Sequence, residues 1–197
     1  MEQKIKNRKN FKVVVVGDGA CGKTSILLRF INEEFNAAYT PTVFETQNAE
    51  FCVKDTLVNL TLWDTAGQED YARLRPLAYE GTDIVILCYS ISSQDSFNNL
   101  TNWLKEIKHF LYHAPIVLVG CKMDLRQTQD KPNPNETGRE TAFLQTKEGE
   151  DFGKAHNMAF VECSSLTGEG IEKVFHTAAE VALSHEHKKK IKVCNIL

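Results

Sequence analysis

The chain has 197 residues, of which 42% are hydrophobic and 25% charged, so it can bury an ordinary core without disulfides or structural metals. The net charge of −3 is uneven: residues 1–12 carry +4 and residues 185–197 carry +3, which leaves an acidic body and argues against nucleic-acid binding. No apolar run approaches the roughly 20 residues of a transmembrane helix, and residues 1–10 are too polar and basic for a signal peptide. We therefore expect a cytosolic protein with a flexible basic N-terminus and six reduced cysteines.

Apolar strand patterns alternate with helix patterns along most of the chain, which is typical of an α/β fold. We predict a six-stranded, mostly parallel sheet with helices on both faces. The predicted strands are 11–17, 47–54, 57–63, 83–90, 115–120 and 158–163. The predicted helices are 23–32, 72–79, 95–111, 147–156 and 170–186. Because only Asp55-Thr56 separates the second strand from the third, these two must form a hairpin with one antiparallel edge strand.

These elements predict one domain over residues 11–185, interrupted by a polar segment at 127–140. Pro132 and Pro134 lack an amide proton and fix φ, so a helix cannot run through them. We expect an irregular loop there, with at most one helical turn at residues 139–144.

A glycine-bounded loop joins the first strand, with Val13–Val16, to the first helix. The loop residues are Gly17, Asp18, Gly19, Ala20, Cys21, Gly22, Lys23 and Thr24. Glycines let successive backbone N–H groups curl around anionic oxygens, and the helix N-terminus adds its positive dipole. Lys23 would reach the β- and γ-phosphates, and Thr24 would bind Mg²⁺. The strand before and the helix after favour this interpretation over a glycine-rich turn before an ordinary core helix.

Polar residues also follow three other strands of the predicted sheet. Asp64–Gln68 follow the third strand, Cys121–Asp124 the fifth and Cys163–Ser165 the sixth. Ligands of open α/β sheets bind outside the carboxyl ends of parallel strands, so these segments should share one pocket with the phosphate loop.

Three stretches resemble the Rho family within the Ras superfamily of small GTPases, and the resemblance extends from Phe11 to Leu197. They read GDGACGKT at 17–24, PTVFE at 41–45 and WDTAGQEDYARLRP at 63–76. The resemblance implies a G domain over residues 11–185 that binds GTP or GDP with Mg²⁺ and hydrolyses GTP slowly. It also implies a switch, because the loop before the second strand is ordered by the γ-phosphate and released on hydrolysis.

The resemblance assigns chemical roles to matching residues. Thr24 and Thr42 would bind Mg²⁺ directly and Asp64 through water, while Lys23, Thr42 and Gln68 would be catalytic, with Gln68 orienting the attacking water. No arginine matches a built-in finger, so hydrolysis would depend on an activating protein, whose arginine is worth about 10³ to 10⁵ in rate. The other residues implied in phosphate contact are Gly17, Asp18, Gly19, Ala20, Cys21, Gly22, Ser25, Tyr39 and Gly67.

The resemblance also implies a partner surface on the two switch loops. Effectors would contact Tyr39, Val43, Phe44 and Glu45, together with residues 70–79. The implied partners are exchange factors, GTPase-activating proteins, a dissociation inhibitor and cytoskeletal effectors of formin or kinase type. The expected output is actin regulation by a monomer.

Lys122 and Asp124 resemble the base-reading pair of the family's [N/T]-K-x-D motif. An aspartate accepts hydrogen bonds from guanine N1–H and N2–H, which adenine cannot donate. Lys122 would cover the face of the base and Phe35 its edge. The last strand would add base contacts from Ser164, Ser165 and Leu166.

Two residues of this base-reading region depart from the family. Cys121 replaces an Asn or Thr that ties the base loop to the phosphate loop, and Leu166 replaces a Lys that helps to pack the base. We therefore expect faster nucleotide exchange than in relatives with the usual residues.

The basic tail at 186–197 ends in Cys194-Asn195-Ile196-Leu197, a C-a-a-X pattern whose Leu favours geranylgeranylation of Cys194. One lipid chain with nearby lysines gives a stable but releasable anchor on anionic membranes. We expect the cytoplasmic face of membranes, chiefly the plasma membrane, with a cytosolic pool. The alternative is a solvated basic helix end with a chance cysteine.

Two other functions remain as alternatives. A P-loop kinase or ATPase is disfavoured by Lys122-Met123-Asp124, which does not suit adenine. A scaffold that does not hydrolyse GTP is disfavoured by Gly19, Thr42 and Gln68, which retain the residue types that hydrolysis needs.

Overall fold

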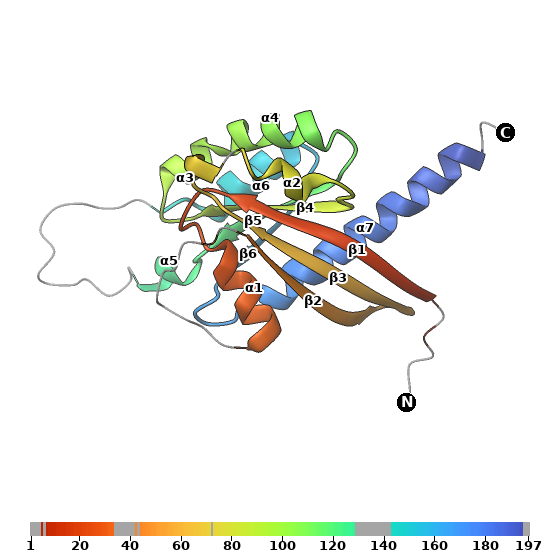
Figure 1. Cartoon of the computed structure of the whole chain (residues 1–197). Coiled ribbons are helices and arrows are strands. Elements are labelled where there is room, and N and C mark those ends of the chain that lie inside the picture. The colour runs from red at the N-terminus through yellow and green to blue at the C-terminus, as the bar shows by residue number, and fades with distance from the viewer. Residues whose placement is uncertain are drawn as a thin grey trace, which may run out of the picture.

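The structure is a computed structural model that describes residues 5, 7–33, 42, 44–71, 73–128 and 143–194, without the side chains of 44, 69, 127, 128 and 189–194. Figure 1 shows one sheet with helices on both faces. The strands are β1 (Asn7–Gly17), β2 (Phe44–Val53), β3 (Thr56–Thr65), β4 (Ile84–Ser90), β5 (Ile116–Cys121) and β6 (Ala159–Cys163). The helices are α1 (Lys23–Asn32), η1 (Glu69–Tyr71), α2 (Pro76–Tyr79), α3 (Gln94–Asn98), α4 (Leu100–Phe110), α5 (Asp124–Thr128), α6 (Thr146–Ala155) and α7 (Ile171–Cys194).

The six strands lie in the order β2-β3-β1-β4-β5-β6. β2 pairs antiparallel with β3 and the remaining neighbours pair in parallel, which confirms the predicted fold class and hairpin. The order reverses at β1, since β3 flanks it on one side and β4 on the other. The phosphate loop therefore leaves the sheet at a topological switch point, where open α/β sheets bind their ligands.

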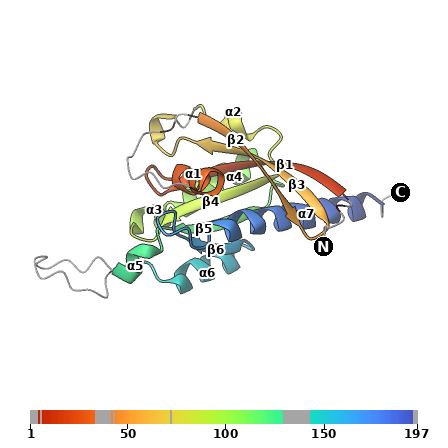
Figure 2. The ribbon, with the colours of Figure 1, turned by 90° about the horizontal axis from the view of Figure 1, so that it is seen from below.

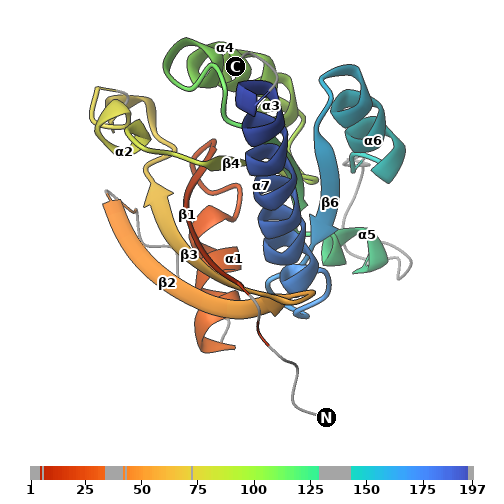
Figure 3. The same cartoon turned by 90° about the vertical axis from the view of Figure 1, so that its right-hand side faces the viewer.

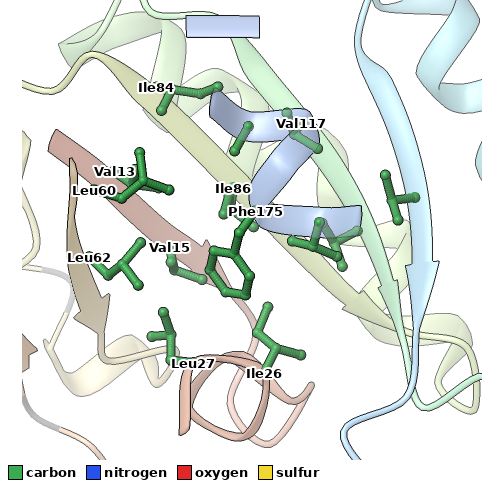
Figure 4. Close-up of a cluster of buried hydrophobic side chains, with 14 of the residues drawn as sticks. Val13, Val15, Ile26, Leu27, Leu60, Leu62, Ile84, Ile86, Val117 and Phe175 are labelled. Atoms are coloured by element: carbon green, nitrogen blue, oxygen red, sulfur yellow. The ribbon is translucent and has the colours of Figure 1, made fainter. Parts of the chain in front are cut away.

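The run Val13–Val16 is buried on both faces of the sheet, and alternate residues enter different cores. Val13 and Val15 join a core built with α1 and α7, in which Phe175 lies among Val15, Ile26 and Leu27 (Figure 4). Val14 and Val16 join a second core built with α2 and α4. Figures 1 and 2 show α1 and α7 on the sheet face opposite to α2, α3, α4 and α6.

Several element boundaries differ from those predicted. β1 begins at Asn7 rather than 11, because Asn7–Asn10 pair with β3 although their side chains are polar. The predicted helix at 95–111 is divided into α3 and α4 at Asn99, and the helix predicted at 72–79 is only Pro76–Tyr79. Helix α7 continues to Cys194, well past the predicted end at 186, because lysines are good helix formers even without a buried face.

The segment around the predicted insertion is described only at its edges. Helix α5 was not predicted, and it begins directly at the base-reading Asp124. Residues 129–142 lie outside the described part, so the expectation of an irregular loop stays a prediction; residues 143–145 have no helical structure. Within the described residues, no helix combines the length and the apolar character needed to cross a bilayer.

Candidate nucleotide-binding site

The phosphate loop has the backbone conformation that its glycines predict. Gly17 and Gly22 have φ values of 141° and 118°, and Ala20 between them is also left-handed at 59°. Lys23 is 5% exposed, and its ammonium group donates to the carbonyl oxygens of Gly17 at 2.9 Å and Asp18 at 2.7 Å. The Lys23 ammonium group therefore lies against the phosphate loop at the N-terminus of α1. An anionic ligand would be stabilised there by both the lysine charge and the helix dipole.

The end of β3 packs directly against this loop. A Cβ atom added to Gly67 would lie 2.5 Å from the carbonyl carbon of Asp18 and 2.5 Å from the nitrogen of Gly19, so only glycine fits there. A Cβ atom on Gly19 would lie 3.4 Å from Cγ of Gln68. The predicted catalytic amide therefore lies beside the phosphate loop, in a position to orient a water molecule near a bound γ-phosphate.

Three oxygen-bearing side chains predicted as metal ligands meet beside the loop. Thr24 Oγ1 donates to Asp64 Oδ2 at 2.6 Å and lies 2.8 Å from Thr42 Oγ1. Asp64 is 2% exposed, and its other oxygen, Oδ1, has no hydrogen-bond partner among the described residues. Burial raises the pKa of Asp64, although the Thr24 hydroxyl and the Lys23 charge oppose the shift.

These observations fit Mg²⁺, because it prefers hard oxygen ligands and keeps several waters. An orphaned buried carboxylate oxygen next to two hydroxyl groups is a site that gains from a cation. Among the described residues, His, Cys, Asp and Glu form no cluster of three that could hold a metal ion. The donors that meet at this site are all oxygens, which suit Mg²⁺ better than a transition metal with its preference for nitrogen and sulfur.

The two base-reading segments lie next to each other at the ends of β5 and β6. Ser164 Oγ donates to Asp124 Oδ1, and the Met123 amide donates to the Cys163 carbonyl at 3.1 Å. Ser164 is fully buried and Ser165 is 7% exposed, whereas Leu166 is 54% exposed. The arrangement brings Asp124 and the two serines together but leaves Leu166 as an exposed side chain.

Cys121 is buried beneath the phosphate loop. Its Cβ atom would be 3.1 Å from a Cβ atom added to Gly22. Lys122 Nζ donates to the Ala20 carbonyl at 2.8 Å and so ties the base loop to the phosphate loop, a connection that sequence reasoning expected to be missing with Cys121. Faster nucleotide exchange stays a prediction.

The cysteines near the site are free thiols packed as small hydrophobic residues. Cys21, Cys88, Cys121 and Cys163 are each at most 2% exposed, and the described cysteines form no disulfide. Burial raises the pKa of Cys21 to about 11. The Cys21 thiol is therefore protonated at neutral pH.

Two ion pairs that support the site were missed by sequence reasoning. Arg126 pairs with Glu162 at 2.6 Å and also donates to the Leu144 carbonyl at 2.7 Å, which links α5 to β6 behind Asp124. Arg75 pairs with Glu106 at 2.9 Å. The partners are 36 and 31 residues apart, so no local pattern could have identified them.

The partner surface is only partly described. Phe35, Tyr39 and Val43 lie outside the described residues, Phe44 begins β2, and Glu45 is exposed. An apolar cavity of about 240 Å³ lies next to Gln68, and the exposed Leu74 and Leu77 are part of its rim. The residues that line it are Trp63, Thr65, Ala66, Tyr71, Leu74, Arg75 and Leu77. Cys194 is the last residue of α7, and its side chain is not described.

Comparison with known protein families gives one match that spans most of the chain. The model described as Ras family matches residues 12–184, from the middle of β1 to the middle of α7. The match includes the phosphate loop, both base-reading segments and the end of β3.

Proposed function

The chain belongs to the Ras family, and from this premise we propose that it is a Rho-type switch that binds effectors in its GTP state and acts at membranes on the actin cytoskeleton. Family membership alone shows that the chain is a GTP-binding P-loop protein and a hydrolase acting on GTP. Proteins of this type bind GTP or GDP, typically with Mg²⁺. Rho-type identity, effectors and location belong to the proposal.

The observation that carries the proposal is the meeting of two chain segments at the phosphate loop. Thr42 reaches Thr24 from the segment before β2, and Gly67 and Gln68 reach Gly19 from the end of β3. A γ-phosphate and its Mg²⁺ would contact both segments at once, so its loss on hydrolysis would release both. These two segments carry the proposed effector residues.

The same residues account for hydrolysis. The hydroxyls of Thr24 and Thr42, with Asp64, would hold Mg²⁺, which neutralises charge on the β- and γ-phosphates when it is bound. Lys23 supplies a fixed positive charge, and Gln68 would orient the attacking water. Arg75, which contacts the Gln68 carbonyl, is also bound by Glu106, so it is not a finger. Slow hydrolysis that needs an activating protein is the expected behaviour.

Guanine selectivity is supported by Asp124. Ser164 holds one of its carboxylate oxygens, which orients the group beside the nucleotide site. The carboxylate can then accept the two donors that guanine has and adenine lacks, at about 1.5–3 kcal/mol for each charged hydrogen bond.

Effector binding and membrane action are supported by surface features. The apolar cavity and the exposed Leu74 and Leu77 beside Gln68 offer a hydrophobic contact area for a partner. The residue pattern of the switch stretches supports Rho-type effectors and hence actin. Four lysines near the end of α7, Lys188–Lys190 and Lys192, together with lipid attachment at Cys194, support binding to anionic membranes.

A nucleotide-dependent pull-down tests the proposal. The protein is loaded with GDP or with a non-hydrolysable GTP analogue, and captured lysate proteins are identified. GTP-selective capture of formin- or kinase-type cytoskeletal proteins is expected. Equal capture in both states would mean that the two segments do not report the γ-phosphate, and the scaffold alternative would replace the switch.

A further inference from the structure

The phosphate loop is fixed to helix α4 through a carboxylate that needs no part in phosphate binding. Asp18 Oδ1 accepts a hydrogen bond from Trp103 Nε1 at 2.7 Å, and Asp18 Oδ2 accepts one from Asn99 Nδ2 at 2.8 Å. Trp103 is only 6% exposed. The side chain of Asp18 is therefore turned toward α4, while its backbone carbonyl binds the Lys23 ammonium group.

The segment that carries Gln68 contacts the same helix. The Arg75 guanidinium group lies 4.5 Å from the centre of the Trp103 ring, and its Nη1 donates to the Gln68 carbonyl at 3.1 Å. Glu106 holds Arg75 with two hydrogen bonds of 3.0 and 2.9 Å. Trp103 thus lies between two groups that hold opposite sides of the reaction site.

Asn99, Trp103 and Glu106 are spaced by four and three residues, so they lie on one face of the helix, which we call the α4 face. Figure 3 shows α2 and α4 on the same side of the sheet. We propose that the α4 face positions the phosphate loop and Gln68 relative to each other for GTP hydrolysis, with Trp103 as the positioning residue shared by both. This inference rests on the GTP hydrolysis in the proposed function and deepens it.

The physical reason is the geometry of water attack. An in-line attack requires Gln68 and the γ-phosphate at a fixed separation, and a misplacement of about 1 Å costs about 100-fold in rate. Arg75 joins the Gln68 carbonyl to Glu106 of α4, so a helix of the second core fixes the Gln68 backbone.

The test uses full-length Trp103→Phe protein, which keeps an aromatic ring beneath Arg75 but loses the Nε1 donor. We expect single-turnover GTP hydrolysis to fall about 10- to 100-fold, while the affinities for GDP and GTP change by less than about threefold. Asn102→Ala, an exposed residue of the same helix, is the matched control and should hydrolyse GTP as the wild type does. In an Asp18→Ala background, Trp103→Phe should change the rate by less than about twofold, because the carboxylate through which it acts is absent.

Hydrolysis by Trp103→Phe within about twofold of wild type would overturn the proposal. Equal losses in the hydrolysis rate and in nucleotide affinity would also overturn it, because they are expected if Trp103 only stabilises the fold. If Trp103→Phe does not fold, Asn99→Ala removes the other donor to Asp18 and should lower the same rate. The wild type in the same assay distinguishes failure of the proposed function from failure of this inference. If the wild type binds GTP but does not hydrolyse it, the proposed GTPase activity is wrong. If every variant hydrolyses GTP normally, only the positioning role of the α4 face is wrong.

Discussion

The phosphate side and the base side of the site are built in different ways. On the phosphate side, only glycine fits at Gly67, and the hydroxyl group of Thr24 donates to Asp64. On the base side, Asp124 is held by long-range partners, through Ser164 directly and through Arg126 and Glu162 behind it. The groups that would contact the phosphates therefore come from local motifs, whereas the base-reading aspartate depends on tertiary contacts, and the departures from the family lie on the base side.

The largest expected effect comes from Gly67→Ala. Its Cβ atom would lie 2.5 Å from backbone atoms of the phosphate loop, so the loop or the end of β3 must move. We expect single-turnover GTP hydrolysis to fall by about 100-fold or more. Gly81→Ala is the control without a steric clash, because no atom lies within 4 Å of a Cβ added to Gly81. A similar loss of hydrolysis in both variants would contradict the steric explanation.

Arg126→Ala should affect the base side instead. It removes an ion pair whose side chains are 20% and 9% exposed, and it leaves Glu162 with the Thr146 hydroxyl but without its cationic partner. We expect GDP to dissociate about tenfold faster and the free energy of unfolding to fall by about 2 kcal/mol. Hydrolysis of bound GTP should stay within about twofold of wild type. Stopped-flow release of a fluorescent GDP analogue measures the first effect.

The control for Arg126 is the exposed pair Arg8–Glu50, with side chains that are 65% and 47% exposed. Arg8→Ala should change the free energy of unfolding by less than about 1 kcal/mol and leave GDP release unchanged. Slower GDP release in Arg126→Ala would refute the proposed division of the site.

Cys121→Asn restores the residue type that relatives use. If Cys121 weakens nucleotide retention, GDP release from this variant should slow about three- to tenfold, which corresponds to about one hydrogen bond. Lys122 already contacts Ala20, so the gain should be modest. The same release assay applies, with Cys52→Ala as a control on a half-buried thiol of β2. Unchanged release would show that the Lys122 contact is sufficient.

The smallest effect is the pH dependence of stability caused by Asp64. Burial raises its folded-state pKa, so in the absence of Mg²⁺ and nucleotide its contribution to stability is lost as pH rises from the unfolded pKa, about 3.9, through the folded pKa. Asp64→Asn should remove this part of the decline and also weaken Mg²⁺ binding. Urea unfolding of nucleotide-free protein across this pH range measures it. Identical pH profiles in the two proteins would rule out the burial explanation.

The fold and the site motifs could be predicted because their signals are local. The apolar run Val13–Val16, the loop glycines and the polar strand ends are each visible within a few residues of sequence. The division at Asn99 and the contacts of Trp103 were not predictable, since a helix pattern does not reveal which loop its polar side chains will contact. The pairing of Asn7–Asn10 with β3 was missed because β-sheet hydrogen bonds need no hydrophobic side chains.

Helix α7 has a further consequence for a membrane-attached protein. Among the side chains of α7 that the structure describes, Ala182 is the last buried one, and Cys194 lies twelve residues further along the helix. At 1.5 Å per residue this is a span of about 18 Å. A lipid chain on Cys194 would then be joined to the domain by a stiff spacer, and the direction in which the GTP-sensing loops face the cytosol would be set by the helix axis.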